Sequence, residues 1–214
     1  MRQPCRQRLV EAGATGAPSW IGHRPYSRSP HSDEKREKTL DIRDATAEDA
    51  AAIAEIYNHA IRHSTATWDT RTVDVANRRA WIADHQQAGD PVLVAVNTET
   101  PGEKHILGYA SYSQWRPFDG YRHTVEHSIY VHPDLHGGGT GTALMAAIID
   151  RARARGVHVM VAGIDAANTG SIRLHERFGF SAVGHLPQVG VKFGGWLDLT
   201  FLQLTLDDRA EPPS

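Results

Sequence analysis

A glycine-rich turn has the residue types and spacing of a phosphate-binding site. The segment His136-Gly137-Gly138-Gly139-Thr140-Gly141 lies between a strand expected over residues 125–132 and a helix expected over residues 140–155. Such a turn exposes several backbone N–H groups and the positive end of a helix dipole, so it favours a pyrophosphate group. A flexible surface turn is the alternative interpretation of the same residues.

Three phosphate-binding signatures can be compared with this turn. A Walker A loop ends in Gly-Lys-Ser/Thr, and the turn contains no lysine. The dinucleotide pattern G-x-G-x-x-G also fails, because its third glycine would fall on Thr142 or Leu144. The turn does resemble the acetyl-CoA loop of the GNAT superfamily of N-acetyltransferases, Arg/Gln-x-x-Gly-x-Gly/Ala, with His136 in the first position.

A second segment, residues 168–180, resembles the same superfamily. There Asn168 precedes a helix that ends in Gly179-Phe180, and most members carry Tyr at the position of His175. A narrower resemblance, to phosphinothricin, methionine sulfoximine and L-amino-acid N-acetyltransferases, covers about residues 40–207. It rests on four blocks, at residues 115–118, 124–131, 174–176 and 192–198.

This resemblance implies a GNAT fold, a reaction and a co-substrate. The fold is of the α/β (α+β) class, with a mixed central β-sheet flanked by helices on both faces. The reaction is direct attack by the amino group of a small amino acid or analogue on acetyl-CoA, and relatives of this type form homodimers. The residues that the resemblance assigns to acetyl-CoA binding are Ile129, Tyr130, Val131, His136, Gly137, Gly138, Gly139, Thr140, Gly141, Thr142, Asn168 and Ser171.

Two side chains are expected to carry the proton transfers. The family pattern implies that Glu126 faces the acceptor amine as the general base, which requires a pKa raised by partial burial. His175 stands where most members use Tyr as the acid, and an imidazole can donate or accept a proton near neutral pH. The alternatives are a solvent-facing carboxylate for Glu126 and a packed histidine for His175.

The acceptor site is expected to lie outside the glycine turn. Arg116 and Arg122 precede the Glu126 strand, and a guanidinium suits a carboxylate or phosphinate through two parallel hydrogen bonds. Aromatic and hydroxyl side chains are expected to form the wall of the pocket, although core packing is the default for the aromatic ones. These wall residues are Thr67, Trp68, Trp115 and Phe118.

A metal site is the competing interpretation of the histidines around the turn. His123 and His127 would share one face of a strand, but Pro133 breaks the geometry before His132 and His136. No cysteine or paired carboxylate completes the set, so we expect no metal. Two other functions remain open: acetylation of a protein amine, and a non-catalytic CoA-binding sensor.

The remaining pattern predicts the element order β-α-α-β-β-β-α-β-α-β-β. Apolar alternation or continuous apolar runs mark the strands, and apolar spacing of three to four residues marks the helices. The strands are expected at 40–44, 91–97, 106–114, 125–132, 157–164, 180–189 and 197–206. The helices are expected after Thr46 and over residues 73–87, 140–155 and 169–178.

Composition limits the class of protein. The chain has 214 residues, 40% of them hydrophobic and 22% charged, with a net charge of −2. This balance fits a globular domain and gives no basis for nucleic-acid binding, and no apolar run suggests a membrane span. The single cysteine, Cys5, fits a reducing cytoplasm.

The chain is expected to divide into three parts. Residues 1–38 lack a regular period and are expected to be a disordered extension, although a start codon assigned too far upstream would explain them equally well. The acetyltransferase domain is expected over residues 39–208, followed by a short tail over 209–214.

Overall fold

The computed structural model describes residues 40–97, 105–135 and 138–213. The expected extension, residues 1–38, lies outside this range, and so do His136 and Gly137 of the glycine turn.

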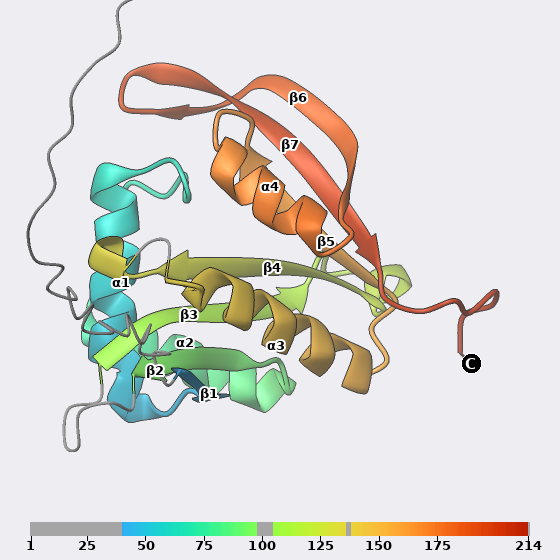
Figure 1. The fold of residues 1–214 in the computed structure, drawn as a ribbon, viewed down its shortest axis with the longest axis horizontal. Helices are drawn as coiled ribbons and strands as arrows, with labels where there is room; N and C mark the ends of the chain where they lie inside the picture. Colours follow the sequence, from blue (N-terminus) through green and yellow to red (C-terminus); the bar gives the residue numbers. More distant parts are fainter. Residues whose placement is uncertain (1–39, 98–104, 136–137, 214) are drawn as a thin grey trace, which may run out of the picture. The chain divides into compact units, whose positions relative to one another are not determined.

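The observed elements follow the expected order (Figure 1). The helices are α1 (Ala50–His63), α2 (Val75–Ala88), α3 (Thr140–Ala154) and α4 (Thr169–Arg177). The strands are β1 (Leu40–Asp44), β2 (Val92–Asn97), β3 (His105–Gln114), β4 (Thr124–Val131), β5 (Val159–Asp165), β6 (Ser181–Lys192) and β7 (Gly195–Thr205). The strands form one sheet in the order β1-β2-β3-β4-β5-β7-β6, in which the β4–β5 pair is parallel and the other pairs are antiparallel. The expected mixed α/β sheet is therefore confirmed.

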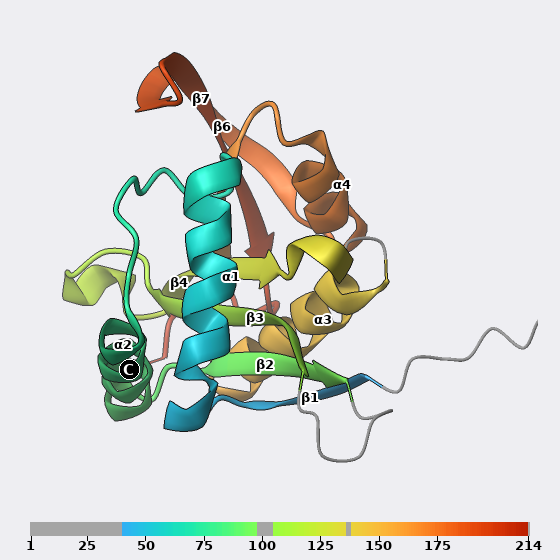
Figure 2. The same cartoon turned by 90° about the vertical axis from the view of Figure 1, so that its left-hand side faces the viewer.

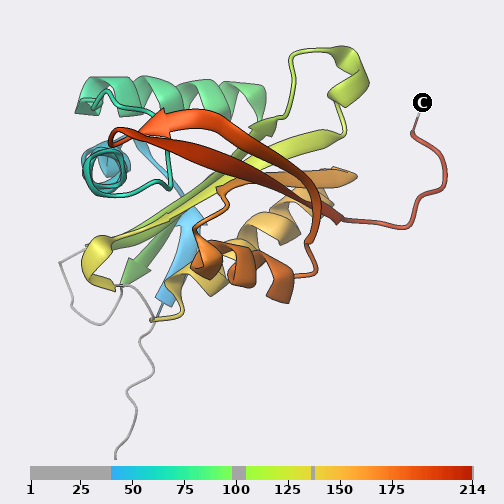
Figure 3. The same ribbon diagram turned by 90° about the horizontal axis from the view of Figure 1, so that it is seen from above.

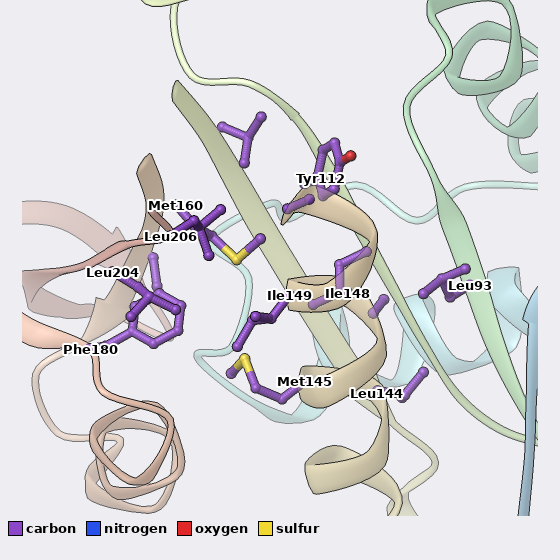
Figure 4. Close-up of a cluster of buried hydrophobic side chains, with 14 of the residues drawn as sticks. Leu93, Tyr112, Leu144, Met145, Ile148, Ile149, Met160, Phe180, Leu204 and Leu206 are labelled. Atoms are coloured by element: carbon purple, nitrogen blue, oxygen red, sulfur yellow. The ribbon is translucent and has the colours of Figure 1, made fainter. Parts of the chain in front are cut away.

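Helices cover both faces of this sheet, as expected (Figure 3). On one face, α1 and α2 pack against β2 and β3 through Ile53, Ile56 and Ile82. On the other face, α3 packs through four apolar side chains against the central strands (Figure 4). These are Leu144, Met145, Ile148 and Ile149, all buried. Burial of an aliphatic side chain of this size contributes roughly 1.5–3 kcal/mol, so this face is a main source of stability.

The first helix begins differently from the expectation. A short 3₁₀ turn, Ala47–Asp49, follows Thr46, and the α-helix itself begins at Ala50. The Asp49 carboxylate accepts hydrogen bonds from the Thr46 backbone N–H at 2.7 Å and from Arg43 at 2.7 and 2.8 Å. Burial alone raises the pKa of Asp49, but the hydrogen bonds from Arg43 and Thr46 outweigh it and hold that pKa below its usual value. The capping contacts thus tie the start of α1 to the end of β1.

The last two strands are longer than the apolar pattern predicts. Strand β6 was expected to end at residue 189, but after an irregularity between Leu186 and Gly190 it continues to Lys192. Phe193 and Gly194 then form a two-residue turn with φ of 51° and 78°. Positive φ at both central residues is the geometry that matches the twist of a β-hairpin. The longer strand places Lys192 on the sheet rather than in a connecting loop.

Strands β4 and β5 are paired along part of their length only. The register joins Thr124 to Val159, Val125 to Met160 and Glu126 to Val161, and no further pair is present between these two strands. Strand β4 continues to Val131 and β5 to Asp165, so the sheet opens beyond the paired segment. This opening positions the candidate active site.

In the described part of the chain, none of the helices has the length and apolar character needed to cross a bilayer.

Candidate active site

A cavity of about 1150 Å³ occupies the opening between β4 and β5. The residues of β4 and β5 that lie beyond the paired segment form its floor. Its walls come from the end of α1, the loop over residues 64–68, the start of α3 and the start of α4. Segments that are far apart in the sequence therefore meet at this one site, as the face shown in Figure 2 illustrates for α1, β4 and α3.

Two helix N-termini contribute to the same cavity. Gly139 precedes α3 with φ of 85°, a left-handed conformation that glycine adopts without strain, and Gly139 to Thr142 line the cavity. At α4, the Asn168 side chain accepts a hydrogen bond from the Ser171 N–H at 3.1 Å and so caps the helix, and both residues line the cavity. Unpaired N–H groups and helix dipoles at two such ends favour an anionic ligand.

Strand β4 lines this space with its residues from His127 to Val131. The Tyr130 ring stacks on Tyr109 at 5.2 Å and meets Tyr57 edge-on at 5.4 Å, on the α1 face of the sheet. Ile129, Tyr130 and Val131 all line the cavity, at the part of β4 where β5 is no longer paired. Backbone N–H and C=O groups on that edge are therefore placed to bond a ligand as a neighbouring strand would.

A buried histidine pair lies in the cavity wall. The Nε2 atoms of His127 and His175 are 3.1 Å apart, and His175 Nδ1 lies 2.7 Å from the Ser171 carbonyl oxygen. A carbonyl can only accept, so His175 Nδ1 carries a proton, and in the neutral ring Nε2 must then accept from His127. Burial lowers the pKa of His127 to about 3, with a smaller contribution from His175. Burial also lowers the pKa of His175, although its bond to Ser171 opposes this shift.

Glu126 is not itself a lining residue of the cavity, and it lies on the opposite face of β4 from His127. Its side chain is exposed, and a Cβ built on Gly163, which lines the cavity, would lie 3.1 Å from Glu126 Oε1. Desolvation by its surroundings raises the pKa of Glu126, and the positive charge of Arg116 opposes that shift. A carboxylate with a raised pKa beside a cavity has the electrostatics of a general base.

The structure divides the expected acceptor residues into two groups. Thr67 and Trp68 line the cavity, whereas Trp115, Arg116, Phe118 and Arg122 are not among its lining residues. The Arg116 guanidinium lies over the Trp115 ring at 4.8 Å. Arg122 donates to the carbonyl oxygens of Asp119 and Pro213, and Phe118 is exposed. The positive charge of Arg116 does act on Glu126, where it lowers the pKa of the carboxyl group.

The expected cofactor residues are brought together with few exceptions. Ile129, Tyr130, Val131, Gly139, Thr140, Gly141, Thr142, Asn168 and Ser171 line the cavity, and Gly138 does not. His136 and Gly137 lie outside the described residues. In the described segments, no group of three His, Cys, Asp or Glu side chains is placed to hold a metal ion. The histidine His127, considered above as a metal ligand, is bonded to His175 instead.

Sequence reasoning missed three residues at or near this site. His127 was weighed only as a metal ligand, although its alternation with Glu126 places it on the face that α4 covers. Gly163 is a glycine within a strand, a pattern that marks close approach of another group, here Glu126 and Phe201. Lys192 belongs to one of the four resemblance blocks, but it was given no role, because its position beside the 64–68 loop depends on the length of β6.

Comparison with known proteins identifies the family. The model of the acetyltransferase (GNAT) family matches residues 53–180. An L-amino acid N-acyltransferase of Escherichia coli is 53% identical over 173 residues, 81% of this chain and 98% of the relative. An L-methionine sulfoximine/L-methionine sulfone acetyltransferase of Salmonella typhimurium is 54% identical, with the same two coverages. Phosphinothricin N-acetyltransferases are more distant relatives.

Solved structures agree with this result. The structure of yncA from Salmonella typhimurium with its cofactor acetyl-CoA is 53% identical, with a TM-score of 0.77. The alignment covers 82% of this chain and 98% of that one. The expected resemblance and fold are thus confirmed by sequence and by structure: the chain belongs to the GNAT family of acetyltransferases.

Proposed function

We propose that the chain transfers the acetyl group of acetyl-CoA to the amino group of a small amino acid or amino-acid analogue. The activities of its relatives, on L-amino acids and on methionine sulfoximine and sulfone, support this reaction. The observation that carries the proposal is the cavity between β4 and β5, which combines two helix N-termini with an unpaired strand edge.

Acetyl-CoA fits the chemistry of this cavity. The N-terminal ends of α3 and α4 would hold the pyrophosphate, through the backbone N–H groups that begin at Gly139 and Asn168. The free edge of β4 at Ile129 to Val131 would bond the amide groups of the pantetheine arm and polarise the thioester carbonyl. Acetyl-CoA supplies the activated acetyl group, and the protein binds it and orients it.

Glu126 is the proposed proton acceptor. The neutral amine nitrogen attacks the thioester carbonyl carbon, a C–N bond forms, and the C–S bond breaks. The amine proton passes to the Glu126 carboxylate, directly or through a water, and the departing thiolate takes up a proton from solvent. The raised pKa of Glu126 suits this role, since a base works best when its pKa approaches the working pH.

For His175 the hydrogen bonds favour a positioning role over direct proton donation. In the neutral ring, the Nδ1–H group donates a hydrogen bond to the Ser171 carbonyl oxygen, and Nε2 accepts one from His127. No proton is then free for the thiolate. We propose that the pair holds α4 against β4 and so fixes Ser171 beside the bound cofactor.

One assay tests the reaction. The purified chain would be given acetyl-CoA with methionine sulfoximine, methionine sulfone, phosphinothricin or ordinary L-amino acids, and thiol release would be measured. We expect turnover with at least one of these amines, and Glu126→Gln should slow it by roughly 10²–10⁴-fold while acetyl-CoA still binds. Turnover with a protein or peptide amine alone would favour the second enzymatic function. Acetyl-CoA binding without turnover would favour a sensor.

We also propose that the chain forms a homodimer and acts in the cytoplasm. Strand β6 is one of the two edge strands of the sheet, and the β6–β7 hairpin exposes several large apolar side chains. An exposed apolar edge strand is a surface that native proteins normally cover. These side chains are Val183, Leu186, Val189, Val191, Phe193 and Trp196. A molar mass near that of one chain in light scattering would contradict the dimer.

A further inference from the structure

Lys192 places its ammonium group inside the protein. The residue is only 4% exposed, at the end of β6. Its Nζ donates to the backbone carbonyl oxygens of Thr67 at 2.5 Å, Ser64 at 2.7 Å and Ala60 at 3.4 Å. An ammonium has three donors, so these carbonyls occupy all of them. The last carbonyls of a helix also carry the negative end of its dipole, which favours a cation there.

The charge of Lys192 is retained at a cost. Burial lowers the pKa of Lys192, and the negative charge of Asp69 opposes that shift. A buried ammonium is tolerated when its donors are satisfied, and here its acceptors belong to the end of α1 and to the loop that follows. The side chain therefore ties the β6–β7 hairpin to residues 60–67.

A second contact from the same strand reaches the same loop. Gly190 is two residues before Lys192 in a regularly paired segment, so both face the same side of β6. A Cβ at Gly190 would collide with the indole ring of Trp68, so the ring packs directly on the strand backbone. Figures 1 and 2 show the turn of the hairpin lying beside the end of α1, where this loop begins.

The loop that these contacts hold is one wall of the cavity. Every residue from Ser64 to Trp68 lines it. The far end of the connection is fixed by Asn58, whose amide group donates to the Val73 carbonyl and accepts from the Val73 N–H, both at 2.8 Å. Tyr57 and Thr67 also share a hydrogen bond at 3.3 Å between their hydroxyl groups. Since a loop has few packing contacts of its own, such anchors determine where its side chains stand.

We propose that Lys192 and Gly190 are positioning residues for the acceptor: they hold the 64–68 loop so that Thr67 and Trp68 form the acceptor side of the cavity. The described ends of α3 and α4, which suit the anionic cofactor, lie outside the Lys192 and Gly190 contacts named above. This inference rests on the proposed acetyl transfer. It assigns a task to the 192–198 block, which the cofactor site does not use.

Two substitutions disturb the loop by independent means. Lys192→Met removes the three hydrogen bonds but keeps much of the side-chain volume. Gly190→Ala introduces a methyl group against Trp68 and leaves the charge intact. Gly184→Ala is the matched control on the same strand, because its Cβ would meet Phe201 only at an ordinary contact distance of 3.8 Å.

The kinetic test compares the effect of each substitution on the acceptor amine with its effect on acetyl-CoA. We expect Lys192→Met and Gly190→Ala to raise the KM for the acceptor amine by about tenfold or more, since pocket contacts discriminate at this scale. The ratio of kcat/KM for methionine sulfone to that for alanine should fall as well. The Kd of acetyl-CoA, measured by calorimetry, should change less than about twofold, a factor worth only a few tenths of a kcal/mol. Gly184→Ala should leave all of these constants unchanged. The proposal would be overturned if the KM for the acceptor amine were unchanged, or if the affinities for the acceptor amine and for acetyl-CoA fell by the same factor.

A second measurement does not depend on turnover. Hydrogen exchange of the backbone amides over residues 64–69 should be faster in Lys192→Met and Gly190→Ala than in Gly184→Ala. Unaltered exchange would overturn the positioning role even if the wild-type protein acetylates no amine. If the wild-type protein acetylates no amine but the two variants still exchange faster than Gly184→Ala, the result counts against the proposed function alone.

Discussion

His127 and His175 share a single hydrogen bond between their Nε2 atoms, although they come from a strand and a helix 48 residues apart. The pair is buried, and Phe180 packs against both rings at 5.5 and 5.1 Å. Because Ser171 accepts from the other nitrogen of His175, the neutral pair has one consistent arrangement of protons. That arrangement leaves His127 Nδ1 as a buried acceptor with no partner among the described residues.

The histidine pair should make stability depend on pH. Burial lowers the pKa of His127 to about 3, whereas a histidine in an unfolded chain titrates near 6.5. The unfolded state therefore binds more protons between these values, and the free energy of unfolding falls as the pH drops below about 6.5. His127→Gln should make this slope shallower, by at most about 1.4 kcal/mol per pH unit. Urea unfolding at several pH values measures the slope, and the exposed His63→Gln is the control. Identical slopes for His127→Gln and wild type would contradict a neutral buried pair.

His175 should not titrate during turnover. Burial lowers its pKa, which favours the neutral ring, and both of its nitrogens are already in hydrogen bonds. We therefore expect His175→Phe to reduce kcat/KM while both limbs of its pH profile remain. Disappearance of one limb would show instead that His175 gains or loses a proton in the reaction. The profile is measured by thiol release with a saturating second substrate.

Arg116 should set the acidic limb of that profile. Its positive charge stabilises the Glu126 carboxylate and lowers its pKa, against the upward shift from desolvation. Removing the charge in Arg116→Gln should therefore raise the pKa of Glu126 and move the acidic limb of kcat/KM to higher pH. Arg122→Gln is the matched control, because that guanidinium bonds the Asp119 and Pro213 carbonyls. A limb that stays in place in Arg116→Gln would mean that another group is the base.

Asp49 should contribute far more stability than the surface carboxylate Asp44. Asp49 is 7% exposed and joins Arg43 to Thr46, whereas the ion pair of Asp44 with Arg151 is largely exposed. Asp49→Asn should lower the free energy of unfolding by about 1–3 kcal/mol, and Asp44→Asn by about 0–1 kcal/mol. The lowered pKa of Asp49 means that its contribution is present above about pH 4 and is lost as the pH falls through the folded value. Urea unfolding at neutral and acidic pH measures both effects. Equal losses for the two variants would contradict the capping role.

The sequence predicted the element order and the buried faces of the elements, because hydrophobic periodicity and helix caps depend on residues that are close together in the chain. Gly89 ends α2 with φ of 74°, and the α3 residues Leu144, Ile148 and Ile149 are buried at the helical spacing that marked this segment. The start of α3 after Gly139 and the start of α4 after Asn168 were marked by local signals, and the family resemblance assigned both to the cofactor.

Features that depend on contacts between distant segments could not be predicted. The bond from His127 to His175 requires knowledge of how α4 lies against β4. The 64–68 loop lines the cavity and is bonded by Lys192 from a distant strand, a contact that no local sequence pattern reveals. The continuation of β6 to Lys192 was hidden by the irregularity after Leu186 and the positive φ of Gln188, 54°.

The partial pairing of β4 with β5 has a mechanical consequence. Three residue pairs connect strands β1 to β4 with strands β5 to β7. The sheet is therefore weakly paired at this junction, which lies beside the cavity. A ligand bound between β4 and β5 would supply the backbone hydrogen bonds that these strands do not make with each other. The rigidity of the sheet and the affinity for the ligand would then rise together. Slower exchange of the backbone amides of β4 and β5 when acetyl-CoA binds would show that the substrate joins the two parts of the sheet.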